Sequence, residues 1–187
     1  MQRIGIFGGS FNPIHNGHIA VAEELLHTNF VDEIWFVISP QNPLKQQSDL
    51  MPDSLRYKLA ATALENRPKL MACDIEFHLP KPSYMWTTLA ELCKKYQEKQ
   101  FVLLIGADNW LVFDRWYRYE DIIKKYDIGI YPRPNYNINE AELPKNVRYF
   151  NTGLYNISST EIRRRLASGE DISELVPLQI AKYLQKL

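Results

Sequence analysis

The stretch GGSFNPIHNGH, residues 8–18, decides the fold class of this sequence. It follows a short apolar run at residues 3–7 and precedes residues 17–27, where apolar side chains recur at helical spacing. A strand, a glycine-rich loop and a helix in this order are the beginning of a βαβ unit. The loop is therefore expected at the carboxyl end of the first strand, which is the edge where parallel sheets bind their ligands.

Apolar runs of strand length alternate with segments of helical period along most of the remaining sequence. Helices between consecutive strands imply parallel pairing with right-handed crossovers, so that helices cover both faces of the sheet. The sequence therefore predicts an α/β fold with a Rossmann-like, doubly wound, mostly parallel sheet. Strands are predicted at 3–7, 33–38, 70–77, 101–105, 128–131 and 147–150, and helices at 17–27, 53–64, 87–96 and 116–126.

The end of the sequence, from about 157 to 187, has helical patterns without strands. Ser158 and Glu161 have the spacing of a capping box for a helix over 158–168, which Gly169 would end. Pro177 is typical of a helix start and predicts a second helix over 177–187. We expect these two helices to form a small helical part of a single domain that spans 1–187.

The composition is that of an ordinary globular protein, with 45 % hydrophobic and 24 % charged residues and a formal net charge of zero. This balance favours neither nucleic acid nor a membrane surface as a partner. Cys73 and Cys93 belong to no paired motif, which indicates reduced thiols. Because we also find neither a signal-peptide pattern nor an apolar run of membrane length, we expect a cytoplasmic protein.

The loop at 8–18 has the residues of a phosphate site. Gly8 and Gly9 allow a ligand to approach the main chain, and the start of the next helix offers backbone N–H groups to an anion. His15 and His18 lie three residues apart around that helix start, so both rings can face one ligand. Imidazoles donate hydrogen bonds to phosphate near neutral pH and become cationic as negative charge accumulates. Either histidine alone would more often be a helix cap or a packed ring, but the pair between glycines favours phosphate chemistry.

A zinc site and the common nucleotide-binding loops explain the same stretch less well. Glu23 or Glu24 could join the two histidines as metal ligands, but no further His, Cys or carboxylate has a fitting spacing. The sequence contains neither GxxxxGK[ST] nor GxGxxG. We therefore expect no metal bound by the protein itself.

Two stretches at opposite ends of the sequence resemble the signatures of the nucleotidylyltransferase superfamily. Residues 8–18 resemble GTFDPxHxGH, and residues 157–163, ISSTEIR, resemble ISSTxxR. The resemblance covers essentially the whole length and is greatest to the bacterial nicotinate-nucleotide adenylyltransferases. It implies transfer of the adenylyl group of ATP to nicotinate mononucleotide, with release of pyrophosphate, in NAD biosynthesis.

The resemblance also implies which residues act on ATP. His15, His18 and Arg163 would be catalytic, and Mg²⁺ would be carried mainly by the ATP phosphates and water. ATP would be bound by the two signatures and by an IGAD-like stretch after the fourth predicted strand. The implied ATP-binding residues are Gly8, Gly9, Ser10, Phe11, His15, His18, Gly106, Asp108, Ile157, Ser158, Ser159, Thr160 and Arg163.

The acceptor side is implied by shorter stretches. Residues 83–89, SYMWTTL, stand in the place of the family's SYTxDTL, and Met85 and Thr87 depart from it. Trp116 would stack on the pyridine ring, although an aromatic residue on a helix is more often part of a core. The implied mononucleotide-binding residues are Lys45, Tyr84, Thr87, Thr88, Trp116, Tyr117 and Arg133.

Three alternatives to this function stay open at the level of the sequence. The acceptor could be nicotinamide mononucleotide, since Met85 and Thr87 depart from the family near that choice. It could also be a different phosphorylated compound, such as phosphopantetheine or glycerol phosphate. A non-catalytic nucleotide sensor could have the same fold, although both histidines, Lys45 and Arg163 are present. The sequence is compatible with a monomer or a homodimer.

Overall fold

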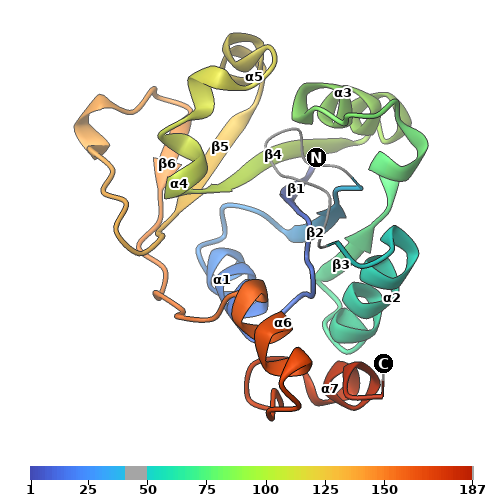
Figure 1. Cartoon of the computed structure of the whole chain (residues 1–187). Helices are drawn as coiled ribbons and strands as arrows, with labels where there is room; N and C mark the ends of the chain where they lie inside the picture. Colours follow the sequence, from blue (N-terminus) through green and yellow to red (C-terminus); the bar gives the residue numbers. More distant parts are fainter. Residues whose placement is uncertain (41–49, 187) are drawn as a thin grey trace.

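The computed structural model describes residues 1–40 and 50–186. Within these residues six strands form one sheet in the order β3-β2-β1-β4-β5-β6, and every neighbouring pair is parallel. This is the strand order of a Rossmann-type, doubly wound sheet, and it confirms the predicted fold class. The strands are β1 (Gln2–Gly9), β2 (Glu33–Ile38), β3 (Leu70–Cys73), β4 (Lys99–Gly106), β5 (Asp127–Tyr131) and β6 (Val147–Tyr149) (Figure 1).

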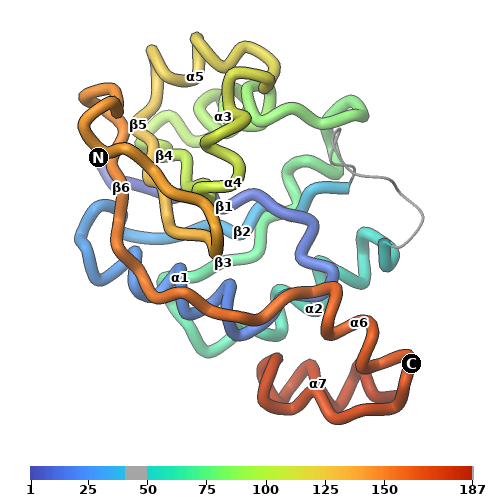
Figure 2. The backbone as a smooth tube through the Cα atoms, turned by 60° about the vertical axis from the view of Figure 1, so that its left-hand side comes forward, coloured from blue at the N-terminus to red at the C-terminus, as the bar shows by residue number. Residues whose placement is uncertain are grey.

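Helices cover both faces of this sheet. Figure 1 shows α1, α2, α6 and α7 on one side and α3, α4 and α5 on the other, and Figure 2 shows the same layers from a second direction. In the part of the chain that the structure describes, no helix is long and apolar enough to span a membrane. The helices are α1 (Asn16–His27), α2 (Asp53–Leu64), α3 (Met85–Lys95), α4 (Ala107–Trp110), α5 (Tyr119–Lys125), α6 (Ser159–Ala167) and α7 (Leu178–Leu184), with 3₁₀ turns η1 (Ile75–His78), η2 (Phe113–Arg115) and η3 (Glu140–Glu142).

The two helical layers follow from the uniformly apolar sequence of the central strands. Successive side chains of a strand point to opposite faces, so a strand that is apolar throughout must be covered on both. In β2, Phe36 packs in the core with α1 and α2, whereas Trp35 and Val37 pack in the core with α3 and α5. The sheet is therefore buried on both sides and leaves its carboxyl edge for a ligand.

The C-terminal helices are part of the same core. Ile162 of α6 and Ile180 of α7 are fully buried in the cluster that also contains α1 and α2. Ser158 caps α6 by accepting from the Glu161 N–H, and Gly169, at φ 67°, follows the end of the helix. The carboxylate of Glu161 does not complete a capping box; it accepts from Arg164 and Arg165. The shared core supports the prediction of one domain over 1–187.

Three predicted elements had a wrong boundary, and one short helix was not predicted. The strand expected at 70–77 ends at Cys73, because Asp74 turns the chain into η1 and its carbonyl accepts from the Phe77 N–H. The helix expected at 116–126 begins only at Tyr119, since Trp116 is extended and Arg118 is left-handed at φ 57°. The short α4 had no predicted counterpart, and α7 ends at Leu184 rather than at 187.

Candidate active site

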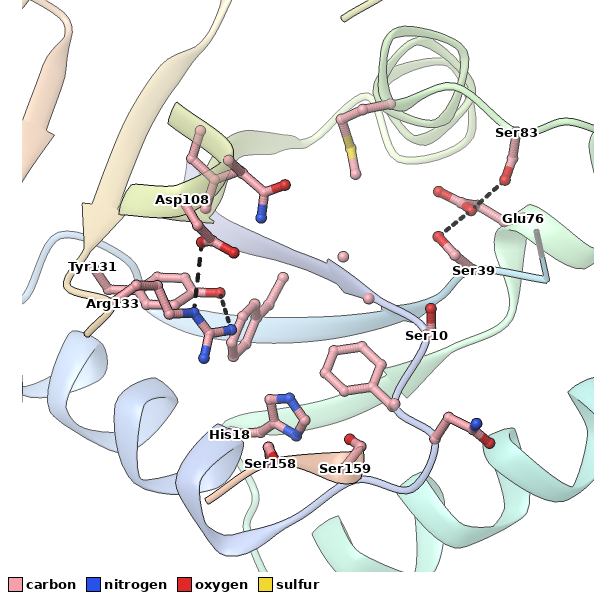
Figure 3. A pocket seen from close by; sticks show the side chains of 18 of the residues that line it. Ser10, His18, Ser39, Glu76, Ser83, Asp108, Tyr131, Arg133, Ser158 and Ser159 are labelled. Atoms are coloured by element: carbon pink, nitrogen blue, oxygen red, sulfur yellow. Dashed lines mark hydrogen bonds and ion pairs between the residues drawn. The ribbon is translucent and has the colours of Figure 1, made fainter. Parts of the chain in front are cut away.

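A cleft of about 650 Å³ opens at the carboxyl edge of the sheet, above β1 and β4. These are the two strands between which the winding of the sheet changes direction, and ligands of doubly wound folds bind there. We call residues 8–18 and 157–163 the phosphate wall. We call the opposite side, formed by Ser39, Glu76, residues 83–85 and residues 115–117, the acceptor wall. Figure 3 shows His18, Ser158 and Ser159 on the first and Ser39, Glu76 and Ser83 on the second.

The two histidines of the phosphate wall fix each other. His15 Nδ1 accepts from the His18 N–H and His18 Nδ1 accepts from the His15 N–H, each at 3.3 Å. Their rings stack with centroids 3.5 Å apart and an interplanar angle of 17°. Because each Nδ1 is an acceptor, the neutral form of each ring carries its proton on Nε2. His15 is therefore a helix cap, since its side chain accepts from the His18 N–H at the start of α1. The two hydrogen bonds and the ring stacking also fix the direction of both Nε2 donors.

His15 is a neutral ring in this environment. Its side chain is only 3 % exposed. Burial, followed by the positive charge of Arg133, lowers the pKa of His15 from its ordinary 6.5 to about 3. At neutral pH His15 is thus a hydrogen-bond donor without charge, which differs from the cationic role that the sequence analysis allowed for both rings.

The beginning of α6 lies directly on the loop that follows β1. Arg163 Nη1 donates to the Asn12 carbonyl at 2.9 Å, and Ser159 Oγ donates to the Pro13 carbonyl at 2.9 Å. These residues are about 150 positions apart in the sequence. The two signatures therefore form one continuous wall of the cleft.

Contacts around α1 hold this arrangement from behind. The Asn16 N–H donates to the Leu175 carbonyl at 2.9 Å. The carboxylate of Glu24 accepts from the Gly153 N–H at 2.7 Å and from the Tyr155 hydroxyl. The segment that leads from β6 to α6 is thus fastened to α1, which carries His18 in its first turn.

A charged pair, Asp108 after β4 and Arg133 after β5, lies at the cleft. Asp108 Oδ1 and Arg133 Nε are 3.6 Å apart, too far for a hydrogen bond between them. A Cβ atom at position 106 would lie 2.3 Å from Asp108 Oδ1, so Gly106 makes room for this pair. Within residues 1–40 and 50–186 both atoms are buried without a hydrogen-bond partner, as are Ser10 Oγ and Trp116 Nε1. Buried polar atoms without partners on one cleft are typical of a site that a polar ligand completes.

The acceptor wall presents aromatic side chains at the mouth of the cleft. The rings of Tyr84 and Tyr117 lie with their centroids 5.0 Å apart. Trp116 lines the cleft beside them and packs on Phe113, with centroids 5.0 Å apart. An aromatic surface of this kind suits a flat heterocycle.

Glu76 is a charged residue of the cleft that the sequence analysis did not identify. It is 2 % exposed, and Ser39, Ser83 and Thr88 each donate a hydroxyl hydrogen bond to its carboxylate. The available signal was an acidic residue between the apolar Ile75 and Phe77, in a run 70–77 that also contains Asp74. Its inward direction depends on η1, which the sequence analysis had assigned to a strand.

Comparison with known proteins agrees with this geometry. Residues 6–165 match the family model described as cytidylyltransferase-like. The chain is 48 % identical to a probable nicotinate-nucleotide adenylyltransferase of Bacteroides fragilis, over 91 % of this chain and 85 % of that protein. It is 46 % identical to the protein of the same description in Bacteroides thetaiotaomicron, over 98 % and 91 %. The chain belongs to the nicotinate-nucleotide adenylyltransferase family.

Solved structures share the fold of this adenylyltransferase family member. The Plasmodium falciparum nicotinic acid mononucleotide adenylyltransferase complexed with NaAD matches with a TM-score of 0.82 at 24 % identity, over 100 % of this chain and 96 % of that one. A putative nicotinate-nucleotide adenylyltransferase from Vibrio parahaemolyticus matches with a TM-score of 0.73 at 24 % identity, over 98 % and 99 %. Both comparisons confirm the Rossmann-like α/β architecture.

The structure brings most of the residues implied by the family resemblance to one cleft. Gly106 lies beneath the Asp108–Arg133 pair, and neither Thr87 nor Thr88 lines the cleft. Thr88 is fully buried and reaches Glu76. Lys45 lies outside the described residues. The predicted residues that line the cleft are Gly8, Gly9, Ser10, Phe11, His15, His18, Tyr84, Asp108, Trp116, Tyr117, Arg133, Ile157, Ser158, Ser159, Thr160 and Arg163.

Other lining residues were not singled out from the sequence. Asn109 and Arg115 lie in the segment that begins with α4, for which no helix was predicted. Arg164 and Arg165, which follow the ISSTEIR stretch, form ion pairs with Glu161. Among the described residues, no group of three or more His, Cys, Asp or Glu side chains could hold a metal ion.

Proposed function

We propose that this chain transfers the adenylyl group of ATP to nicotinate mononucleotide, giving nicotinate adenine dinucleotide and pyrophosphate in NAD biosynthesis. The observation that carries the proposal is the contact between the HxGH loop and the start of α6, which form one wall of a cleft with an aromatic opposite wall. Relatives that are 46–48 % identical are described as probable nicotinate-nucleotide adenylyltransferases.

The reaction needs little covalent chemistry from the protein. The attacking group is a phosphate oxygen of the mononucleotide, which is already anionic at neutral pH, so no general base is required. This oxygen forms a bond to the α-phosphorus in line, and the bond to the bridging oxygen breaks as pyrophosphate leaves. The task of the cleft is to bring two anions together and to stabilise the charge that develops.

The phosphate wall has the donors for that task. His18 and His15 would donate from Nε2 to the reacting phosphates, with His18 the more direct of the two. The N–H groups at the start of α6 and the Arg163 guanidinium would hold the leaving pyrophosphate. The neutral state of His15 supports a donor role that adds no charge of its own.

Gly8 to Phe11 and Asp108 would surround the remainder of ATP. Trp116, Tyr84 and Tyr117 would receive the pyridine ring of the mononucleotide, and Arg133 would contact its phosphate. The unpartnered Trp116 Nε1 and Asp108 Oδ1 support a polar ligand on this side of the cleft.

Mg²⁺ would enter the cleft with ATP. It supplies neutralisation of the phosphate charge, and Mg²⁺ commonly keeps several waters and binds through substrate phosphates. Chelation with EDTA is expected to abolish turnover, and added Mg²⁺ to restore it.

We further propose a cytoplasmic location, which the unpaired thiols of Cys73 and Cys93 and the use of ATP support. The acting species would be a monomer or a homodimer.

Pyrophosphate release from ATP tests the function directly. The purified protein is given ATP and Mg²⁺ with nicotinate mononucleotide, nicotinamide mononucleotide or phosphopantetheine in parallel. Highest kcat/KM with nicotinate mononucleotide is the expected result. A preference for another acceptor overturns the substrate assignment, and tight ATP binding without release in any arm identifies a nucleotide sensor.

A further inference from the structure

The acceptor wall contains a buried carboxylate that no part of the reaction uses. Glu76 lies in η1 and is 2 % exposed. Its Oε2 accepts from Ser39 Oγ at 2.7 Å and from Ser83 Oγ at 2.6 Å, and its Oε1 accepts from Thr88 Oγ1 at 2.8 Å. Figure 3 shows the Ser39 and Ser83 side chains converging on Glu76 from different segments.

Burying this charge is expensive for the fold. An ionised carboxylate removed from water is tolerated only when hydrogen bonds replace its hydration. A carboxylate has about four acceptor positions, and three hydroxyl groups satisfy most of those of Glu76. Satisfied networks of this kind hold their members in one arrangement, which an apolar side chain at the same place would not do.

The three hydroxyl groups come from separate segments at and behind the acceptor wall. Ser39 directly follows β2, Ser83 precedes α3, and Thr88 lies in the first turns of α3. Ser39 is fixed a second time, because its carbonyl accepts from Arg56 Nη1 at 2.9 Å. The same guanidinium nitrogen donates to the Ser10 carbonyl of the phosphate wall.

We propose that Glu76 is a positioning residue for the acceptor nucleotide. Its carboxylate sets where α3 begins relative to the end of β2, and thereby sets the distance from Tyr84, which packs on Tyr117, to the phosphate wall. Thr88 acts on the acceptor through Glu76 rather than by contact. This inference rests on the proposed function, since it assigns the acceptor wall to nicotinate mononucleotide.

The substitution Glu76→Gln tests the inference with little change of shape. An amide oxygen in the place of Oε2 can still accept from Ser39 and Ser83, but the NH₂ group in the place of Oε1 cannot accept from Thr88, and the negative charge is lost. The KM for nicotinate mononucleotide is expected to rise about tenfold or more, since hydrogen bonds to a charged group are lost. The kcat and the KM for ATP are expected to stay within about twofold of wild type.

A second pair of variants changes Thr88 and leaves the Glu76 carboxylate in place. Thr88→Val is expected to raise the acceptor KM, whereas Thr88→Ser, which keeps the hydroxyl, stays close to wild type. The double variant with Glu76→Gln is expected to show less than the product of the two single effects, because both act through one network. Glu120→Gln, at an exposed glutamate of α5, is the matched control and leaves every constant unchanged.

Three results overturn the positioning role. One is a lowered melting temperature of Glu76→Gln and Thr88→Val with an unchanged acceptor KM, which leaves only a structural role. Another is a fall of kcat without a change of either KM, which would indicate contact with the reacting atoms. The third is equal behaviour of Thr88→Val and Thr88→Ser, which also decides the case where Glu76→Gln fails to fold. Absence of pyrophosphate release by the wild-type protein overturns the proposed function itself and is distinguished by that measurement.

Discussion

The phosphate wall is formed by two contiguous stretches of sequence, whereas the acceptor wall collects single side chains from several segments. In the phosphate wall, the groups proposed to face the ligand are backbone N–H groups at helix starts and side chains one turn away from them. In the acceptor wall, Glu76, Trp116 and Tyr84 come from η1, the segment after η2 and the residue before α3. The difference teaches that phosphate handling can be recognised from local spacing, while acceptor selection depends on tertiary packing.

The same difference divides the expected kinetics. Changes in the phosphate wall are expected to act mainly on kcat and on ATP, since transition-state charge develops there. Changes in the acceptor wall are expected to act mainly on the KM for nicotinate mononucleotide. The following variants can break or sharpen this division.

The largest effect is expected for His18→Ala. Loss of a donor to the developing charge is expected to lower kcat about a hundredfold or more. The matched control is His27→Ala, at the exposed end of the same helix, which is expected to turn over normally. Steady-state pyrophosphate release measures both. Near-normal turnover of His18→Ala would show that this ring has no part in the mechanism. It would also contradict the expectation that changes in the phosphate wall act mainly on kcat.

Arg163→Ala is expected to have the next largest effect. It removes charge-assisted hydrogen bonds to phosphate, so kcat/KM for ATP is expected to fall about tenfold to a hundredfold. Arg164→Ala is the comparison, since Arg164 is half exposed and paired with Glu161 and Glu170. Similar losses in the two variants would mean that the charge of the helix matters and not the position of one guanidinium.

Trp116→Ala examines the opposite wall. Loss of an aromatic surface for the pyridine ring is expected to raise the acceptor KM about tenfold, with kcat/KM for ATP little changed. Trp86→Ala controls for general destabilisation, because Trp86 packs against Tyr126 away from the cleft. A fall of kcat with an unchanged acceptor KM would mean that Trp116 acts on the phosphate chemistry. It would contradict the expected division of kinetic effects between the two walls.

The smallest effect concerns His15 and the pH dependence of stability. The pKa of His15 is about 3 in the folded protein and about 6.5 when unfolded. Between these values the unfolded chain binds a proton that the folded chain does not, so stability falls as the pH is lowered from 6.5 towards 3. The loss is at most about 1.4 kcal/mol per pH unit.

His15→Asn removes this titration and keeps an acceptor at the helix start. Urea unfolding at pH 6.5 and pH 5 is expected to show a smaller pH dependence for the variant than for wild type. An equal change of the free energy of unfolding between pH 6.5 and pH 5 in the two proteins would mean that His15 binds a proton as readily in the folded chain as in the unfolded chain. His15 would then be a cationic and not a neutral donor in the phosphate wall.

Much of the fold could be predicted from the sequence because its elements end at clear signals. The strand at 33–38 and the helix at 53–64 were correct to the residue, the latter because Pro52 and Asp53 mark its start. In the run 70–77, residues 70–73 form the predicted strand, but residues 75–77 were misassigned to it. Their buried side chains suit a strand and a 3₁₀ turn equally. The turn at Asp74 is a tertiary outcome that periodicity does not encode.

The candidate site could likewise be predicted where its residues belong to a local sequence pattern. The signatures around His15 and Arg163 are contiguous, and the structure brings them together. The resemblance gave Thr88 as a substrate contact, yet the structure directs its hydroxyl to Glu76. The direction of a single hydroxyl depends on what packs around it, so neither the motif nor its spacing could supply it.

The bond from Arg163 to the Asn12 carbonyl has a consequence for how the molecule matures. During synthesis the N-terminal loop leaves the ribosome long before its partner helix has been made, since 151 positions separate the two. Most strands of the sheet can pair earlier, but the site proposed for the triphosphate is incomplete until α6 packs against the loop after β1. Assembly of the nucleotide pocket during synthesis therefore waits for α6, and a chain that stops before residue 159 would lose both this wall of the pocket and the core packing of Ile162 and Ile180.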